Sequence, residues 1–394
     1  MSCAKKYGPG AILINKETTF NLPVALGVLM PVQSASIGAL NREKIDNNEA
    51  RMNRGTSAPF DGAQSEIPWE IQVLMNFDND TTSGYGMLCW GAGRESDGKL
   101  AKQSICGRSL QITRFDRDGL LCEVLNGCLV QNITYGLSAN DMCSVTFSGV
   151  AASKWEINGI KSGAGLTSIS TSATSVTVSN HSRNSYGVMG ETISATTPSG
   201  IGVKCYDSDG DLVADGVVSD ITTSSYIIDF TTIHADSTFS IDSILLNYGS
   251  KSLESYTIIG PADWQCRVYW GDDFETINPQ TVEFTLETGL SFGDLTAAKA
   301  LPSEIISANN SATCSVTMYL DDMADTIMQK NYLAVQVYKR GSSPGYQMLN
   351  MPKGIFTSRP AYELASDTAA SGTFELQGAA EENNNNVFGW NITL

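Results

Sequence analysis

The sequence predicts an all-β protein with small helices, built from two similar β units in tandem. Val, Ile, Thr and Tyr recur in short alternating runs that Gly, Asn and Asp interrupt, a pattern typical of half-buried strands joined by turns. Long helical periodicity is nearly absent. A succession of strand, polar turn and strand near residues 105–153 recurs near residues 333–381, which predicts a duplicated unit.

The landmarks of the two copies keep their order. A Leu-Asn pair at Leu125 and at Leu349 lies between two strands in each copy, and a strand ending in a small-residue stop follows. The offset between the copies is 224 residues at that pair and 229 residues between Gly149 and Gly378, so the copies differ by small insertions.

Upstream segments extend the repeat. An alternating strand from Trp69 precedes the first copy, as one from Cys314 precedes the second, and each runs into an acidic turn that can start a short helix. Ile37 and Ile244 open a third pair of matching segments, each followed by a long polar stretch. The alternative is that unrelated β domains share such patterns, but the conserved order favours duplication.

The order of these segments divides the chain into four parts. We expect an N-terminal arm over 1–36, a first β unit over 37–155, a Ser/Thr-rich linker or hairpin over 156–199, and a second unit with a C-terminal tail over 200–394. Each unit opens with a polar stretch too long for an ordinary loop, and such arms usually reach a neighbouring molecule. The best helix candidates are residues 294–306 and 323–330.

No set of residues in the sequence predicts catalysis, a metal or a cofactor. The chain has two histidines, His181 and His234, in polar segments, too few for a triad or a histidine metal cluster. Asp207, Asp209 and Asp211 lack the spacing of a calcium loop and predict a solvated turn instead. We therefore expect that the protein is not an enzyme and holds no cofactor.

Composition narrows the partners and the compartment. The net charge is −17, with 42 acidic against 25 basic residues, so the chain is not expected to bind nucleic acid, which requires clustered Lys and Arg. The sequence has no run of 18 apolar residues and no secretory core near its start, which predicts no membrane span and synthesis in a cytoplasm. Nine cysteines without Cys-x-x-Cys spacing predict reduced core thiols.

The segments that carry the repeat resemble a known family. Residues 40–55, the strand at 110–115, the run from Leu125 through Tyr135 to Gly149, and the segment from Leu349 are similar to the tail tube (major tail) proteins of long-tailed bacteriophages. The resemblance covers most of residues 37–155 and 200–380 and rests on strand order and turn residues. Residues 156–199 and the C-terminal tail depart from it.

The resemblance implies two tandem β-sandwich tube domains whose strands contribute to a ring-wide inner β-barrel. Closing the ring would also hide strand edges that otherwise aggregate. Stacked rings would form the hollow virion tail, assembled in the host cytoplasm, through which DNA passes without specific binding. Further partners would be other tail proteins at the tube ends. With two tube domains per chain, a homotrimeric ring has pseudo-sixfold symmetry, and a homohexamer is the alternative.

Site residues and further elements follow from the resemblance. We expect carboxylates in the lumen and charged arm residues in contacts between rings, with an arm and hairpin in 41–75, a second arm and hairpin in 247–287, and helices near 79–90 and 322–330. The lumen candidates are Glu70, Glu283 and Glu287, and the ring-contact candidates are Arg42, Glu43, Arg51, Arg54, Lys251 and Glu254.

Two other functions remain open at this point. The chain could be a two-domain β-sandwich decoration protein or adhesin, whose loops bind sugar or protein. A polysaccharide depolymerase would need a pair of carboxylates in a cleft, which no sequence pattern supports.

Overall fold

The structure is a computed structural model. It describes residues 10–38, 42–45, 60–64, 66–76, 80–100, 107–179, 181–184, 198–222, 225–255, 257–271, 273–293, 304–341, 348–360, 371–379 and 387–390. These residues form antiparallel β-sheets with two short helices, so the all-β class with small helices is confirmed.

The first half of the chain, residues 10–158, forms strands around one helix. Strand β1 pairs with β2 and β7, and the order across the sheet continues through β8 and β9 to β6 and β3. The elements are β1 (Ala11–Lys16), β2 (Val28–Met30), β3 (Ser34–Ile37), β4 (Arg42–Ile45), β5 (Phe60–Gln64), β6 (Ile67–Leu74), α1 (Gly84–Gly91), β7 (Leu110–Phe115), β8 (Leu121–Ser138), β9 (Ser144–Ala151) and β10 (Ser153–Asn158).

The second half, residues 264–390, repeats this series of pairings. Strand β19 pairs with β20 and β25, and the order continues through β26 and β27 to β24 and β21. The elements are β19 (Trp264–Trp270), β20 (Asp273–Ile277), β21 (Thr281–Glu287), β22 (Leu290–Phe292), β23 (Ile305–Ser307), β24 (Ser311–Tyr319), α2 (Asp322–Met328), β25 (Tyr332–Lys339), β26 (Met348–Ser358), β27 (Ser371–Gly378) and β28 (Gly389–Trp390).

The two halves therefore correspond strand by strand. In each half a hairpin (β4–β5 or β22–β23) precedes the strand that leads into the helix, and the two hairpins occupy the same place in the order. Even the last short strand has a counterpart, because β28 pairs with Leu349 and Asn350 of β26 as β10 pairs with Leu125 and Asn126 of β8. The sequence landmarks at Leu125 and Leu349 thus lie at equivalent positions.

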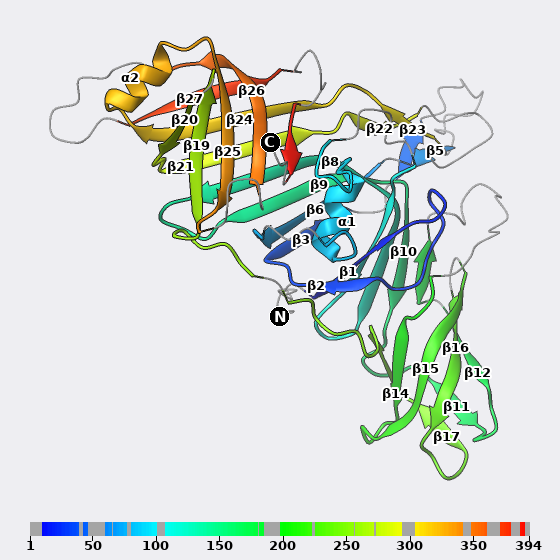
Figure 1. Ribbon diagram of the computed structural model, residues 1–394. Coiled ribbons are helices and arrows are strands. Elements are labelled where there is room, and N and C mark those ends of the chain that lie inside the picture. Colours follow the sequence, from blue (N-terminus) through cyan, green and yellow to red (C-terminus); the bar gives the residue numbers. More distant parts are fainter. Residues whose placement is uncertain are drawn as a thin grey trace, which may run out of the picture.

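Strand β8 joins the halves into one sheet. Residues 121–128 of this long strand pair with β7 and β10, whereas residues 129–138 pair with β9 on one side and with β21 of the second half on the other. The pairing of β8 with β21 runs over seven positions, from Asn132 opposite Glu287 to Ser138 opposite Thr281. Figure 1 shows β8 and β9 running alongside β21 and β24 through the middle of the molecule.

Residues 160–247 form a middle module that the repeat does not include. Its largest sheet has the order β12-β16-β15-β14-β18, and it projects from the first half (Figure 1). The elements are β11 (Leu166–Ile169), β12 (Ser175–Ser179), β13 (Ser182–Asn184), β14 (Gly202–Tyr206), β15 (Leu212–Ile221), β16 (Ser225–Ile233), β17 (Phe239–Ile241) and β18 (Ser243–Asn247).

The middle module shares a core with the first half. Leu13, Phe115 and Trp155 of the first half are buried in the same apolar cluster as Tyr226 and Ile244 of the module. The Tyr226 hydroxyl also donates a hydrogen bond to the carbonyl oxygen of Asn158, 3.1 Å away. Burying a joint apolar surface of this kind holds the module against the first half.

These boundaries correct the division expected from the sequence. Residues 11–37 hold three paired strands of the first half and are not an arm, because most of their apolar side chains are buried in the cores or packed against them. Residues 156–199 contain strands of the middle module, and the second half begins near residue 264 and not at residue 200. Ile244 lies on β18 of the module, so the counterpart of the segment at Ile37 is β21.

The helices agree in part with those expected from the sequence. Helix α2 begins after Asp321, whose side chain accepts from the backbone N–H groups of Met323 and Ala324, and α1 begins after Ser83. Helix α2 falls within the region expected near 322–330, and α1 lies in the region expected near 79–90 but ends one residue later, at Gly91. The helix expected over 294–306 is not confirmed, because Ile305 and Ile306 lie in strand β23 and residues 294–303 lie outside the described residues.

The last described residues connect the halves. Phe388 is fully buried, stacks on Tyr135 of β8 with ring centroids 6.0 Å apart, and meets the edge of Phe284 of β21. Trp390 donates from Nε1 to the Tyr135 hydroxyl at 2.5 Å. The described part of the C-terminal tail thus contains aromatic residues that pack at the junction of β8 and β21.

Candidate functional site

The most distinctive surface of the described residues is one face of the joined sheet, which we call the polar face. It spans seven adjacent strands in the order β3-β6-β9-β8-β21-β24-β27. Most of its residues carry hydroxyl, amide or carboxylate groups, and Gly136, Pro68 and half-buried Leu74 are the exceptions on its strands. The polar residues and the glycine are Ser34, Ser36, Glu70, Gln72, Ser144, Thr146, Ser148, Asn132, Thr134, Gly136, Ser138, Thr281, Glu283, Thr285, Glu287, Ser311, Thr313, Ser315, Thr317, Ser371, Thr373, Glu375 and Gln377.

Strand alternation creates this face. Successive side chains of a strand point to opposite sides of the sheet. In β21, Val282, Phe284 and Leu286 are buried in the main core, whereas Glu283 and Glu287 are exposed. Strands β6, β24 and β27 alternate in the same way, so a buried apolar core lies behind an exposed polar surface in both halves.

The register aligns the polar side chains in rows across the strands, because directly paired residues share a face. One row crosses all seven strands through Ser34, Gln72, Thr146, Thr134, Thr285, Thr313 and Gln377. Within the rows, the hydroxyl oxygens of Thr134 and Thr285 lie 3.4 Å apart and those of Thr317 and Thr373 lie 2.9 Å apart. The first contact joins the two halves, and the second joins β24 to β27 within the second half.

The charge on the polar face has a single sign. Its charged residues are Glu70, Glu283, Glu287 and Glu375, all exposed, and none of the residues that form the face is Lys, Arg or His. The Glu287 carboxylate accepts a hydrogen bond from Ser311, with 2.8 Å between the oxygens. A surface of hydroxyls and carboxylates without a cation repels a polyanion or leaves it unbound.

All three carboxylates expected in a lumen lie on this face. The structure brings Glu70 of the first half onto the same surface as Glu283 and Glu287 of the second half. The fourth carboxylate, Glu375, was not among the candidates. The alternation of Thr373, Glu375 and Gln377 with Phe374 and Leu376 is the signal that could have identified it.

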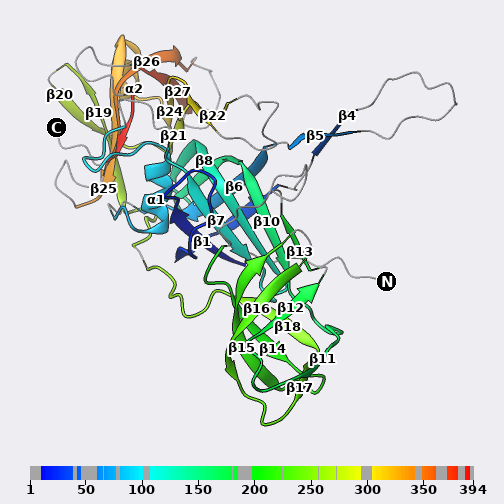
Figure 2. The ribbon, with the colours of Figure 1, turned by 90° about the vertical axis from the view of Figure 1, so that its right-hand side faces the viewer.

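The ring-contact candidates are scattered. Arg42 and Glu43 lie on β4, which Figure 2 shows with β5 pointing away from the main sheet, and Arg51 and Arg54 lie outside the described residues. Lys251 is exposed in the segment between the middle module and β19. The arm expected over 247–287 holds that segment and the strands β19, β20 and β21.

Glu254 is engaged inside the chain. Its carboxylate oxygens accept from the backbone N–H of Gly84, the first residue of α1, at 3.0 and 3.1 Å. Its own N–H donates to the carbonyl oxygen of Leu29 at 3.0 Å. A carboxylate is favourable at this position because the N-terminus of a helix carries partial positive charge. Glu254 thus fixes the connecting segment to the first half.

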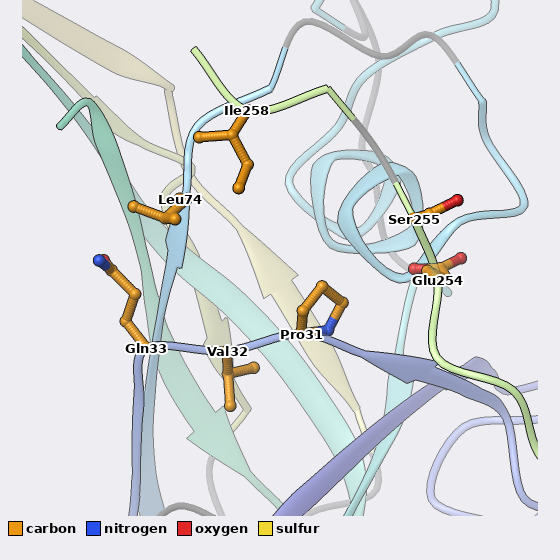
Figure 3. Close-up of a pocket in the computed structure, with 7 residues that line it drawn as sticks. All are labelled: Pro31, Val32, Gln33, Leu74, Glu254, Ser255 and Ile258. Carbon is orange, nitrogen blue, oxygen red and sulfur yellow. The ribbon is translucent and has the colours of Figure 1, made fainter. Parts of the chain in front are cut away.

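A small pocket lies beside this contact. Its volume is about 230 Å³, and it lies between the start of β3, the end of β6 and the connecting segment. Figure 3 shows side chains from these three segments around it, and its lining consists of Pro31, Val32, Gln33, Leu74, Glu254, Ser255 and Ile258. Since the Glu254 carboxylate is already hydrogen-bonded to α1, the pocket offers mainly apolar surface and a glutamine amide.

A buried ionic cluster lies where β7 and β10 pair with the first part of β8, and no sequence pattern indicated it. The Lys154 ammonium is buried and lies 2.6 Å from the Glu123 carboxylate and 2.9 Å from that of Glu156, and Arg114 also pairs with Glu123. Lys154 donates in addition to the carbonyl oxygen of Gly38, directly after β3. Buried charges are stable only when they are paired in this way, so the cluster fixes the end of β3.

Glu17 is a second buried carboxyl group. It accepts from Ser109 Oγ at 2.7 Å and from the backbone N–H groups of Gly127 at 2.7 Å and Asn21 at 2.9 Å. Burial raises the pKa of Glu17 to about 7, although these hydrogen bonds oppose the rise. The group connects the residues after β1 to Gly127, which lies in β8 at an irregularity of its pairing with β7 and has a φ of +63°.

The remaining candidates for chemistry have structural surroundings. His234 Nε2 lies 2.8 Å from the Asp215 carboxylate on the middle module, and Asp207 Oδ1 accepts from the N–H groups of Asp209 and Asp211 to close a turn. The cysteines in the described part of the chain are free and buried, and burial raises the pKa of Cys205 to about 12, which disfavours a reactive thiolate.

Two kinds of feature are absent from the described residues. No group of three or more His, Cys, Asp or Glu side chains there is placed to hold a metal ion. Among the same residues, no helix has the length and apolar character that crossing a membrane requires.

Comparison with known proteins places the chain in no family. No protein-family model matches the sequence. No curated protein matches it either. What can be inferred about function therefore comes from the residues of this chain and from the polar face that they build.

Proposed function

We propose that the protein is a structural virion protein that polymerises as stacked rings into the hollow tail tube of a long-tailed bacteriophage. In this proposal the two halves are tandem β-sandwich tube domains, and the polar face lines the channel through which DNA passes. The observation that carries the proposal is that polar face, which runs without a basic residue across strands of both halves.

The chemistry of the face suits passage of DNA. A protein that binds DNA neutralises phosphates with Lys and Arg, and each such contact strengthens binding. A channel wall that must release a polyanion requires the opposite composition. Hydroxyls keep the wall hydrated, and the carboxylates Glu70, Glu283, Glu287 and Glu375 keep phosphates from resting on it.

The correspondence of the halves supports the ring. Each half supplies a strand of equivalent position to the joined sheet, and β8 and β21 join the halves by ordinary strand pairing. If the same kind of junction recurs between subunits, three chains provide six equivalent positions and the sheet closes into a barrel. A ring of six chains, in which one half lines the channel and the other decorates the outside, is the alternative.

One observation favours a second candidate function. The middle module, residues 160–247, is additional to the repeat and projects from the first half (Figure 1). A projecting β module is typical of a decoration protein or adhesin that recognises sugar or protein. In a tail tube this module would lie on the outside, so the two functions are compatible only if the chain also polymerises.

Negative-stain electron microscopy of the purified protein tests the proposal. We expect rings or tubes with a central channel, and their yield should rise with protein concentration. A discrete oligomer without a channel at every concentration, together with binding to a glycan array, would support the adhesin and exclude the tail tube.

A further inference from the structure

Two strand edges remain open at the two ends of the polar face. Within the described residues, β3 pairs on one side only, with β6. The end of β26 after Ile355 likewise pairs on one side only, with β27, because its pairing with β25 stops at Ile355 opposite Tyr332. An open edge presents unpaired backbone N–H and C=O groups that can pair with another strand.

The corresponding edges inside the chain are closed against each other. Strand β21 is the counterpart of β3, and residues 129–138 of β8 correspond to the end of β26. These two internal edges form the junction between the halves. The chain therefore contains this contact once in closed form, between β21 and β8. The two corresponding edges, those of β3 and of the end of β26, are open within the described part of the chain.

The strand pairings next to these edges define which residues of the two halves correspond. Thr134 of β8 lies opposite Thr146 of β9, and Ser358 of β26 lies opposite Glu375, the matching position of β27. Ser36 of β3 matches Thr285 of β21, because each is opposite a matching residue of the next strand, Glu70 or Thr313. In the internal junction Thr285 lies directly opposite Thr134.

We propose that β3 of one copy of this chain pairs antiparallel with the end of β26 of a second copy, in the register of β21 on β8. This register places Ser36 of one copy opposite Ser358 of the other. The proposal rests on the proposed function, since it describes the seam that closes the ring, and it identifies the partner as a second copy of the chain.

The side chains at the two edges fit this register. Ser36 and Ser358 are exposed and would meet on the polar face, as the hydroxyl groups of Thr285 and Thr134 do. On the opposite side, half-buried Ile37 would lie near half-buried Phe356, because the irregularity between Phe356 and Ser358 gives Phe356 the position that Ile133 has in the internal junction, opposite Leu286. A slip of one residue toward Arg359 would place half-buried Ile37 opposite exposed Ser358, which the alternation disfavours. A slip toward Thr357 would place Ser36 opposite the irregularity between Phe356 and Ser358, where the regular pairing of β26 is interrupted.

The seam would also extend the polar face. The row of residues that crosses the seam at Ser36 and Ser358 would contain no basic residue. Glu375 lies opposite Ser358 in one copy, and Glu70 lies opposite Ser36 in the other. The row would therefore read carboxylate, hydroxyl, hydroxyl and carboxylate across the contact. Exposed Ile355, 49% accessible in the single chain, would be partly covered by the incoming strand.

Cysteine cross-linking tests the register. Directly opposed residues of antiparallel strands have Cα atoms close enough for a disulfide. We expect Ser36→Cys mixed with Ser358→Cys to give a covalent dimer on oxidation, while neither single variant does so alone. The double variant should give covalent species up to the closed ring, seen by electrophoresis without reductant.

Two matched pairs control the experiment. Thr134→Cys with Thr285→Cys probes the closed internal junction and should form a disulfide within one chain, which shows that such a pair is compatible with folding. Ser36→Cys mixed with Thr357→Cys is slipped by one residue and should cross-link far less. The unsubstituted chain reports any background from the native thiols.

The outcomes distinguish a failure of the proposed seam from a failure of the proposed tail-tube function. Rings in the microscope, with a cross-link only when Ser36→Cys is mixed with Ser358→Cys, support both. Rings that cross-link in the slipped pair, or in neither, overturn the proposed register and leave the tail-tube function standing. A protein that forms neither rings nor tubes overturns the tail-tube function and the seam with it.

Discussion

At the scale of single residues, charge placement decides what the surface can bind. The chain has 25 basic residues, yet none belongs to the polar face. Elsewhere basic groups are used in contacts, as Lys154 is in the buried cluster and Arg267 is over the ring of Phe274 at 4.3 Å. The polar face is thus distinguished by the residue types that it lacks among its members, and this property can be reversed by substitution.

Reversing the charge of the polar face should create DNA binding. Replacing Glu70, Glu283, Glu287 and Glu375 by Lys clusters four cations on one surface. We expect the unsubstituted protein to show no gel shift with double-stranded DNA at low salt and the variant to bind with an affinity that falls steeply as salt rises. A matched control replaces Asp118, Asp209, Asp236 and Glu304, exposed carboxylates away from the face, by Lys. Equal binding by the control would show that net charge and not the face is responsible.

Protonation of Glu17 should make stability depend on pH. Its pKa in the folded chain is about 7, above the ordinary 4.5, so the folded state holds the proton more tightly than the unfolded state. The stabilisation from this proton is complete below pH 4.5 and is lost as the pH rises through 7, a change of about 3 kcal/mol at 1.36 kcal/mol per pKa unit.

Denaturant unfolding across this pH range measures the effect. We expect the free energy of unfolding to fall between about pH 5 and 8 and the Glu17→Gln variant to lack this part of the slope. Glu304→Gln, at an exposed position, is the control and should keep the slope of the unsubstituted chain. An unchanged slope in Glu17→Gln would assign the pH dependence to other groups.

At the scale of elements, β8 has the central role. Its first part belongs to the sheet against which the middle module packs, and its second part carries the junction with β21. Thr288 reinforces that junction, because its hydroxyl donates to the carbonyl oxygen of Val130 at 2.7 Å and its N–H donates to that of Gln131. The hairpin of β4 and β5 differs, because within the described residues these strands pair only with each other.

Removing most of that hairpin should separate folding from assembly. Deletion of residues 43–56 leaves the described strands of the main sheet and both cores in place. We expect a folded protein, with unchanged unfolding in denaturant, that no longer forms tubes, because an arm that reaches a neighbouring ring contributes to the interface and not to the core. Normal tubes from the deletion variant would show that the arm does not hold rings together.

At the scale of the whole molecule, two corresponding halves make one continuous sheet, and the middle module adds a projection on one half only. The asymmetry means that a ring of three chains would carry three modules on six positions. Closed cyclic assembly is the usual outcome of contacts in which one edge of a molecule meets a different edge of its copy.

Native mass spectrometry of single rings counts the subunits. We expect a mass of three chains, each of 42.2 kDa, because both halves have the strands that the joined sheet uses. End-on averages in the microscope should then show six similar positions and three projections. A mass of six chains would assign one half to the outside of the tube.

The β class, the repeat and the exposed carboxylates can all be predicted from the amino-acid order. Alternation is local, so Glu70, Glu283 and Glu287 could be assigned to a polar side of their strands from their neighbours alone. Likewise, Leu125 and Leu349 identified equivalent positions, which the structure places inside strands β8 and β26, because a repeated unit keeps its short-range order.

Which strands pair with each other, and which segments pack into a common core, can be determined only from the folded chain. That β8 pairs with β21, that residues 11–37 complete the first half, and that residues 160–247 form a separate module all depend on contacts between residues far apart in the chain. Such pairing leaves no periodic signal in the sequence, because any strand with the right alternation can serve as the partner of another. The partner is selected by the packing of whole faces, and only the tertiary contacts bring the carboxylates of both halves onto one surface.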